Sequence, residues 1–240
     1  MRDRNDMKAK LPFLFVNVAI TADGKIAPPN RHFVPFSSKR DQELLMELRT
    51  RADAVMAGAR TVDMGRVDLG PGKAKYRKIR IANGLPEYNL RVIVSGSASL
   101  NPRAYIFSQR FSPIIVLVSN SAPQARVEAL RSVADDVHVS GGKAVDFVAA
   151  LAYLREQWGI NKLLCEGGGE VNSQLFRQKL VDELYLTICP VIFGGRDAPT
   201  LADGEGIERL ADATQLRLKG MERVGDEMFC VFRIKKESGK

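Results

Sequence analysis

Short apolar runs alternate with amphipathic segments along most of this 240-residue chain. The runs predict strands at Leu11–Ile20, Ala54–Ala57, Arg91–Ser95, Ile114–Ser119 and Val137–Ser140. The amphipathic segments predict helices at Pro123–Val133 and Asp146–Trp158, and an earlier helix that carries Leu44, Leu45 and Leu48 behind the capping-box-like Ser38–Asp41. Repeated alternation of strand and helix indicates a largely parallel sheet with helices on both faces and ligands at the carboxyl ends of its strands.

The last third of the chain has a different pattern. Long strands are predicted at Glu183–Phe193, Gln215–Val224 and Glu227–Lys235, and the last two are joined at Gly225-Asp226. We therefore expect an α/β fold with a mixed, mostly parallel sheet and a C-terminal antiparallel hairpin. The sequence contains no repeat and no linker, so we expect one domain over residues 11–236, with flexible segments at residues 1–10 and 237–240.

Three consecutive glycines and an acid stand between a predicted strand and a predicted helix, in the segment Leu163–Asn172. Glycine permits a tight turn and a close approach of the backbone, and the first N–H groups of a helix that begins near Glu170 have no partners within the helix. This combination suits a phosphate of a nucleotide cofactor. The spacing matches neither the Rossmann fingerprint nor a Walker loop, and a tight turn without a ligand is the alternative.

Composition narrows the class of protein. With 45% hydrophobic and 27% charged residues, the chain can bury a large core. Its longest apolar runs, Leu11–Ile20 and Ile114–Val118, are far shorter than the roughly 20 residues of a membrane-spanning helix, and its polar N-terminus does not resemble a signal peptide. We therefore expect a cytoplasmic protein with no membrane partner.

The three cysteines, Cys165, Cys189 and Cys230, are widely spaced and lie in apolar runs. This placement predicts reduced core thiols rather than a disulfide framework. His32 and His138 are also far apart, so the sequence predicts no metal site.

The net charge of +8 is concentrated between Arg60 and Arg91. The stretch contains eight basic residues and three acidic ones. The basic residues are Arg60, Arg66, Lys73, Lys75, Arg77, Lys78, Arg80 and Arg91, and the acidic ones are Asp63, Asp68 and Glu87. Because the stretch is also rich in glycine and proline, we predict a basic loop, which could bind a phosphorylated small molecule, bind nucleic acid or form a solvated surface. Tyr76 and Tyr88 are its only aromatic residues, which disfavours nucleic acid.

Several segments together resemble the reductase domain of riboflavin biosynthesis. They are Asn17–Ile26, Ala54–Val62, Glu166–Gly169, Leu180–Leu184 and Pro190–Gly195, and the resemblance extends over nearly the whole chain. It implies a dihydrofolate-reductase-like fold, NADPH as cofactor, a homodimer, and reduction of the ribosyl group of a 5-phosphoribosylaminopyrimidine to a ribityl group. The chain lacks the His-x-Glu…Pro-Cys-x-x-Cys signature of the deaminase to which bacterial members are often fused, so it resembles the stand-alone form.

The resemblance also implies the cofactor site. It assigns the NADPH phosphates to Gly167, Gly168, Gly169, Glu170 and Val171, in agreement with the helix-terminus argument. It further assigns cofactor contacts to Gly58 and Thr61, and a contact with the adenosine 2′-phosphate to Ser95 and Gly96. A serine at position 95 has the alternative of capping a loop.

On the substrate side, the resemblance implies that Arg49 binds the substrate, that Glu166 contacts its ribose and that Asn17 faces its pyrimidine. A carboxylate such as Glu166 or Asp23 could carry the proton that the reaction requires. Each residue has a structural alternative: a solvated helix position for Arg49, backbone satisfaction for Asn17, and the first position of an Asp-Gly turn for Asp23.

One segment departs from the family pattern. After Thr61-Val62 the family usually has a paired-aspartate-and-proline loop that ends in Leu-Thr-x-Arg, whereas this chain has Asp63–Gly72 followed by basic residues. Arg66, Lys73 or Arg77 could replace the missing arginine as a ligand of a phosphate. Two other functions stay open for the protein: a paralogous reductase of a pterin or other imine, and a non-catalytic nucleic-acid-binding protein.

Overall fold

The computed structural model describes residues 11–32 and 35–235, which divide into two compact units. Unit 1 takes the residues up to Phe13 and Met46–Leu164, and unit 2 takes Leu14–Leu45 and the residues from Cys165 onward. The flexible segments predicted at residues 1–10 and 237–240 lie outside the described residues. The single domain predicted over residues 11–236 stays a prediction.

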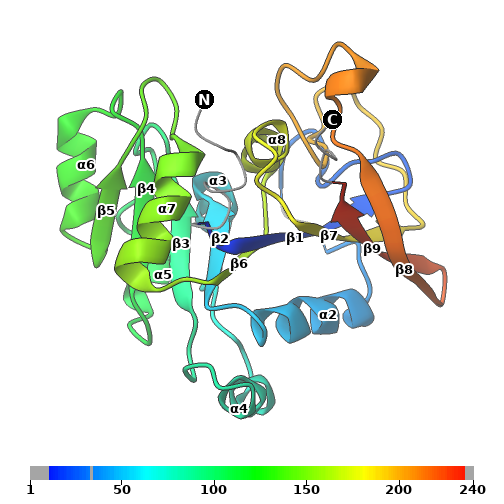
Figure 1. Ribbon diagram of the computed structural model, residues 1–240, viewed down its shortest axis with the longest axis horizontal. Coiled ribbons are helices and arrows are strands. Elements are labelled where there is room, and N and C mark those ends of the chain that lie inside the picture. The colour runs from blue at the N-terminus through cyan, green and yellow to red at the C-terminus, as the bar shows by residue number, and fades with distance from the viewer. Residues whose placement is uncertain (1–10, 33–34, 236–240) are drawn as a thin grey trace. The chain divides into compact units, whose positions relative to one another are not determined.

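The strands of unit 1 follow the order β5-β4-β3-β2-β6 (Figure 1). Their bounds are β2 Ala54–Gly58, β3 Leu90–Val94, β4 Ile114–Val118, β5 Asp136–Val139 and β6 Lys162–Cys165. The pairs β2–β3, β3–β4 and β4–β5 are all parallel. Every residue of β2 and β4 is buried, which requires cover on both faces of this part of the sheet.

The helices that connect these strands along the chain are α3 Ala59–Asp63, α4 Ala74–Ala82, α5 Tyr105–Ser108, α6 Gln124–Arg131 and α7 Phe147–Trp158. The preceding helix, α2 Lys39–Arg49, belongs to unit 2 up to Leu45 and to unit 1 from Met46. The predicted N-terminus of α2 is confirmed, because Ser38 Oγ accepts from the Asp41 N–H at 3.4 Å.

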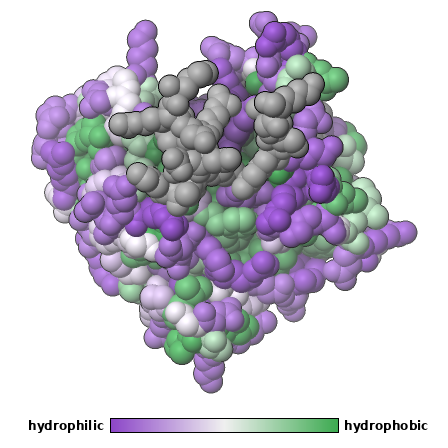
Figure 2. Space-filling model, in the orientation of Figure 1, coloured by the Kyte–Doolittle hydropathy of each residue, from purple (hydrophilic) through white to green (hydrophobic). Residues whose placement is uncertain are grey.

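The basic stretch between Arg60 and Arg91 is not the loop that the sequence predicts, because it contains the short helix α3 and the nine-residue α4. Lysine, arginine and alanine are good helix formers, and Tyr76 and Arg80 supply the buried side of α4. Ile79 and Ile81, the neighbours of Arg80 in the chain, are exposed on its two flanks, and Figure 2 shows hydrophobic side chains over this helix.

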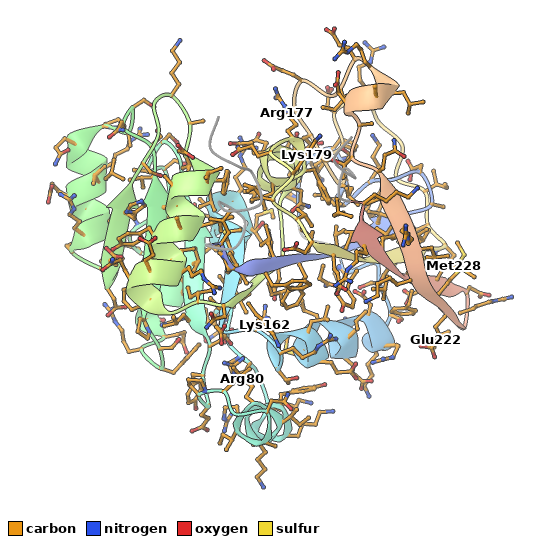
Figure 3. The ribbon with its side chains drawn as sticks, viewed as in Figure 1. Arg80, Lys162, Arg177, Lys179, Glu222 and Met228 are labelled. Carbon is orange, nitrogen blue, oxygen red and sulfur yellow. The ribbon has the colours of Figure 1, made fainter. Side chains whose placement is uncertain are left out.

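Arg80 anchors α4 to the chain before β2 (Figure 3). It is fully buried, and its Nη1 donates to the carbonyl oxygens of Arg49 and Ala52 at 2.5 and 2.6 Å, while its Nε donates to that of Pro86 at 2.9 Å. Burial lowers the pKa of Arg80, and the charge of Asp53 partly offsets this effect. Arg80, whose charge suggests a surface position when only the sequence is considered, is therefore part of the core.

Arg91 has a similar position in β3. It is fully buried, its guanidinium lies 4.2 Å from the centroid of the Phe111 ring, and it donates to the carbonyl oxygens of Ile106 and Ser112. Burial lowers its pKa to about 10. With Arg80 and Arg91 inside the protein, the basic stretch presents less surface charge than its composition suggests.

In unit 2 the strand order is β1-β7-β9-β8. The elements are β1 Phe13–Thr21, α8 Gly169–Arg177, β7 Glu183–Cys189, the 3₁₀ turn η1 Leu210–Asp212, β8 Leu216–Val224 and β9 Glu227–Ile234. The pair β1–β7 is parallel, and β7–β9 and β8–β9 are antiparallel, so the predicted mixed, mostly parallel sheet with a C-terminal hairpin is confirmed. The strand predicted to reach Phe193 ends at Cys189, because Pro190 has no N–H for the ladder.

A buried carboxylate joins three strands of unit 2. Glu183 Oε1 accepts from Lys219 Nζ at 2.8 Å and lies 3.7 Å from Arg233 Nη2, and its Oε2 accepts from the Tyr185 hydroxyl at 3.2 Å. Burial by itself raises the pKa of Glu183, but the hydrogen bond and charge of Lys219, with Tyr185 and Arg233, outweigh it and lower the pKa. The carboxylate therefore favours the folded state when it is ionised.

We predict that Arg80→Met lowers the free energy of unfolding by about 3 kcal/mol, about 1 kcal/mol for each buried carbonyl that loses its donor. Equilibrium urea unfolding measures this loss. Lys78→Met makes the same change at an exposed position of α4 and should alter the stability by less than about 0.5 kcal/mol. Equal effects of the two variants would contradict the anchoring role.

We predict that Glu183→Gln destabilises the protein at pH 7 by about 1–2 kcal/mol. Because the pKa of Glu183 is lower in the folded protein than its ordinary value of 4.5, its contribution is complete above that value and is lost as the pH falls through the folded pKa. The stability difference between wild type and variant should therefore shrink between pH 6 and pH 3. A difference that stays constant over this range would show that Glu183 acts through its shape alone.

Candidate functional site

The glycine run of unit 2 forms the turn predicted between β6 and α8. Gly167 and Gly168 have φ angles of +77° and +100°, which other residues rarely adopt, and Gly168 is the N-cap of α8. Within the described part of the chain, the N–H groups of Gly168, Gly169 and Val171 donate to no protein atom. Three free donors at a helix N-terminus form a site for an anion such as a phosphate.

Gly169, the third glycine of the run, is required for a different reason, which is the space available beside it. A Cβ at Gly169 would lie 2.3 Å from Asp203 Oδ2 and 2.5 Å from the carbonyl oxygen of Thr200, because the loop after β7 packs on the first turn of α8. The Asp203 N–H donates to the Gly169 carbonyl oxygen at 3.0 Å, and Asp203 Oδ1 accepts from the N–H and hydroxyl of Thr200. Gly169 is therefore required by this loop, whether or not a ligand is bound.

Asn172 adds a second link between α8 and the same loop. Its Nδ2 donates to the carbonyl oxygen of Leu201 at 2.9 Å, and a Cβ at Gly167 would lie 3.0 Å from this nitrogen. Thr200 and Asp203 were not predicted from the sequence, because nothing in the spacing shows that they reach α8.

Asp23 lies in the turn after β1, where Gly24 has a φ of +80°. Its carboxylate accepts from the Thr21 hydroxyl at 2.5 Å and from the N–H groups of Gly194 and Phe193 at 2.7 and 3.3 Å. The hydrogen bond from Thr21 is the main cause of a lowered pKa of Asp23, and those from the two backbone groups act in the same direction. The carboxylate of Asp23 thus links the turn after β1 to the segment after β7, as the turn alternative predicts.

Asn17 lies in β1 and is 7% exposed. Its Oδ1 and the hydroxyl of the fully buried Thr187 are without a hydrogen-bond partner among the described residues. Asn17 pairs with Tyr185 and Ala19 pairs with Thr187 in the parallel β1–β7 ladder, so these two polar side chains share a face of the sheet. Unsatisfied buried polar atoms are uncommon, and two on one face indicate a place for a polar ligand or a water molecule. In the sequence, Thr187 is a polar residue within an apolar strand, and no motif marks it as part of a site.

In unit 1, Gly58 is the N-cap of α3, and Thr61 lies one turn into that helix, half-buried. Arg49 is buried and donates to the carbonyl oxygen of Gly70, so it braces the divergent loop Asp63–Gly72. The structural alternative of a solvated Arg49 is therefore wrong. Arg66 is exposed, with its guanidinium 5.0 Å from the centroid of the Tyr105 ring.

Ser95 follows β3 and is 3% exposed. Its Oγ accepts from the Leu100 N–H at 3.1 Å, and its carbonyl oxygen accepts from the Ala98 N–H at 2.7 Å. The adjacent Gly96 carbonyl oxygen accepts from the N–H and the hydroxyl of Ser119. Ser95 thus caps the loop that follows it, as the structural alternative predicts.

The structure brings the predicted residues of each unit together at strand ends. In unit 2, Gly167, Gly168, Gly169, Glu170 and Val171 share one turn that directly follows Glu166, which is half-buried and hydrogen-bonded or charge-paired. In unit 1, Gly58 and Ser95-Gly96 stand at the carboxyl ends of the paired strands β2 and β3. Arg66 lies beyond α3.

The prediction that Cys165, Cys189 and Cys230 are buried free thiols is confirmed. Burial raises the pKa of Cys165 and of Cys189 to about 12, which keeps both thiols protonated. Among the described residues, no group of three His, Cys, Asp or Glu side chains is arranged to hold a metal ion. Every helix in the described ranges is too short or too polar to cross a lipid bilayer.

The fold is that of the pyrimidine reductases. A pyrimidine reductase-like protein from Corynebacterium diphtheriae superimposes with a TM-score of 0.76 at 21% identity, over 96% of this chain and 95% of its own. The RibD protein of Acinetobacter baumannii gives a TM-score of 0.77 at 18% identity, over 96% of this chain and 60% of that longer one. The dihydrofolate-reductase-like fold expected from the sequence is confirmed.

Residues 12–230 match the RibD C-terminal domain family, and the chain belongs to that family. The 2,5-diamino-6-ribosylamino-4(3H)-pyrimidinone 5′-phosphate reductase of Methanothermobacter thermautotrophicus is 36% identical to it, over 93% of this chain and 99% of the relative. The protein of the same name from Archaeoglobus fulgidus is 34% identical, over 90% of this chain and 94% of the relative.

We predict that Gly169→Ala lowers the free energy of unfolding by about 1–3 kcal/mol, because the added methyl group forces the loop around Thr200 and Asp203 away from α8. Chemical denaturation measures the effect. Gly220→Ala is the control, since a Cβ at Gly220 meets no atom within 4 Å. If Gly169→Ala is as stable as this control, the loop does not hold the turn in solution.

Proposed function

We propose that this protein is an NADPH-dependent reductase that converts a 5-phosphoribosylaminopyrimidine of riboflavin biosynthesis into its ribityl product. Family membership and the names of two relatives above 30% identity support this reaction. The observation that carries the proposal is the glycine turn at the N-terminus of α8, where the N–H groups of Gly168, Gly169 and Val171 have no acceptor among the described residues. Donors without an acceptor at a helix N-terminus support nucleotide binding, because they can hold the oxygens of a phosphate.

The residues of the glycine turn fit the phosphates of a dinucleotide cofactor. The positive φ angles at Gly167 and Gly168 form the tight turn, the N–H of Gly168 has no acceptor among the described residues, and the dipole of α8 adds partial positive charge. Within unit 2, Glu170 and Val171 in the first turn of α8 are further proposed cofactor contacts. In unit 1, Gly58 and Thr61 are proposed cofactor contacts on the family resemblance, and they lie at the start of α3. When it is bound, NADPH supplies the hydride of the reaction.

The chemistry requires one proton together with that hydride. The C1′–O4′ bond of the ribosylamine ring breaks, the ring oxygen takes a proton, and the resulting iminium carbon C1′ accepts the hydride. Glu166 stands directly before the glycine turn and is the proposed proton carrier. Asp23 has a lowered pKa and remains ionised, so it suits stabilisation of the positive iminium rather than proton donation.

Recognition of the substrate is assigned to polar groups of β1 and to basic residues. Asn17 has an unsatisfied Oδ1 that can accept from an amino or ring N–H of a pyrimidine. Arg66 is exposed in the divergent loop and is the proposed ligand of the substrate phosphate. Arg49 supports that loop through Gly70, so its contribution to binding includes holding the loop in place.

The homodimer that the resemblance implies remains a prediction. Burial of Arg80 and Arg91 and the pairing of Arg77 with Glu87 at 2.9 Å reduce the basic surface that the nucleic-acid alternative requires. A cytoplasmic location also remains a prediction.

We predict that Glu166→Gln retains NADPH affinity and lowers turnover by about 10² or more, the usual scale for a general acid. The test follows NADPH oxidation in a single turnover with the phosphoribosylaminopyrimidine and measures cofactor binding by fluorescence titration. Glu156→Gln, at an exposed position of α7, is the matched control.

The results separate the possible roles of Glu166. A full rate in Glu166→Gln would remove it from the mechanism, and a loss of stability of about 1 kcal/mol with an unchanged rate would leave it a capping role only. Absence of turnover in the wild-type protein, with NADPH bound, would contradict the proposed substrate and favour a pterin or another imine.

A further inference from the structure

Three buried polar side chains of unit 2 have hydrogen-bonding atoms without a protein partner. Asp41 of α2 is 8% exposed, Asn17 of β1 is 7% exposed and Thr187 of β7 is fully buried. Among the described residues, Asp41 Oδ1, Asn17 Oδ1 and the Thr187 hydroxyl take part in no hydrogen bond. Unsatisfied buried polar atoms are uncommon in folded proteins, so three of them in one unit indicate a missing polar partner.

The two strand residues of this set lie on one face of the sheet. Asn17 pairs with Tyr185 and Ala19 pairs with Thr187 in the β1–β7 ladder, and side chains two residues apart in a strand point to the same face. Cys189, two residues after Thr187, lies on this face as well. Ala19 is partly exposed and has only a methyl side chain, so the face is accessible beside Thr187.

The first turn of α2 brings Asp41 to the same face. Burial raises the pKa of the Cys189 thiol to about 12, and the charges of Glu227 and Asp41 act in the same direction, so both carboxylates lie near this thiol. Glu227 is already used within the fold, because it accepts from the N–H and from the hydroxyl of Ser38. Asp41 Oδ1 has no such donor in the described part of the chain, so Asp41 is the carboxylate that can accept from a ligand.

The unused groups of this face are mainly acceptors. An ionised carboxylate and an amide oxygen only accept hydrogen bonds, whereas a hydroxyl group can donate or accept. A ligand that satisfies them must therefore present N–H donors. A pyrimidine with an amino group at C2 and a hydrogen at N3 presents two parallel donors, which match the two oxygens of a carboxylate. A uracil has a carbonyl oxygen at C2, which a carboxylate oxygen would repel.

We propose that Asp41 determines the substrate specificity of the reductase, and that it selects a pyrimidine with an amino group at C2 over the corresponding uracil. The inference rests on the proposed function and names the substrate class within it. Asp41 accepts from the C2 amino group and from the N3–H, and the Thr187 hydroxyl is a second acceptor for the amino group. The preference thus follows from the match between acceptors of the protein and donors of one ring edge.

The test compares wild type, Asp41→Asn and Glu43→Gln with two 5-phosphoribosylaminopyrimidines that differ at C2, one with an amino group and one with a carbonyl group. NADPH oxidation gives kcat/KM for each. We expect wild type to prefer the amino compound at least about 100-fold. Asparagine offers one donor and one acceptor, so Asp41→Asn should lower kcat/KM for the amino compound about 10-fold or more and raise it for the uracil. Glu43→Gln removes the same charge from a partly exposed position of α2 and should match wild type.

A second measurement does not depend on hydride transfer. Calorimetry compares the binding of 2,5,6-triamino-4-pyrimidinone and of 5,6-diaminouracil, which are the two bases without ribose phosphate, to the same three proteins. Wild type and Glu43→Gln should bind the triamino base at least about 10-fold more tightly than the uracil, and Asp41→Asn should lose this preference. Urea unfolding of each variant shows whether the protein remains folded.

The outcomes are distinguishable from failure of the proposed function. If wild type reduces both compounds with equal kcat/KM, the inference is wrong although the reductase function stands. An Asp41→Asn variant that loses activity equally with both compounds would also overturn it, since Asp41 would then only support the fold. If wild type reduces neither compound but binds the triamino base more tightly through Asp41, the inference stands and the proposed reductase function fails.

Discussion

The glycine turn after β6 depends on the absence of a side chain at position 169. The loop that carries Thr200 and Asp203 occupies the space that a Cβ would need, and it hydrogen-bonds to Gly169. Because this packing fixes the first turn of α8, the neighbouring N–H groups of Gly168 and Val171 are held in one arrangement without a ligand. A site that is fixed before binding does not spend binding free energy on its own ordering.

In unit 1, buried guanidinium groups donate hydrogen bonds to carbonyl oxygens that would otherwise need backbone N–H donors. Arg80 satisfies carbonyl oxygens of Arg49, Ala52 and Pro86, and Arg91 satisfies those of Ile106 and Ser112. Carbonyl groups at helix ends and in connections would otherwise be buried without donors, which is costly. These two arginines thus support the segments before and after β3 instead of adding charge to the surface.

The two carboxylates considered for catalysis differ in their surroundings. Asp23 accepts three hydrogen bonds in a turn, which lowers its pKa and commits it to the ionised form. Glu166 directly follows β6, at the start of the glycine turn. The carboxylate of Asp23 is therefore engaged in a turn, whereas Glu166 stands beside the proposed phosphate site.

The sequence by itself determined the alternation of strands and helices, the closing hairpin at Gly225-Asp226 and the glycine turn before α8, because hydrophobic period and glycine position are local signals. It did not reveal α4, because glycine and proline around that segment suggested a loop and the burial of Arg80 depends on distant carbonyl groups. It also did not identify Thr187 or Asp203. The contact of Asp203 with α8 and the unsatisfied hydroxyl of Thr187 were decided only by the tertiary structure, because the groups that surround a side chain come from segments far away in the chain.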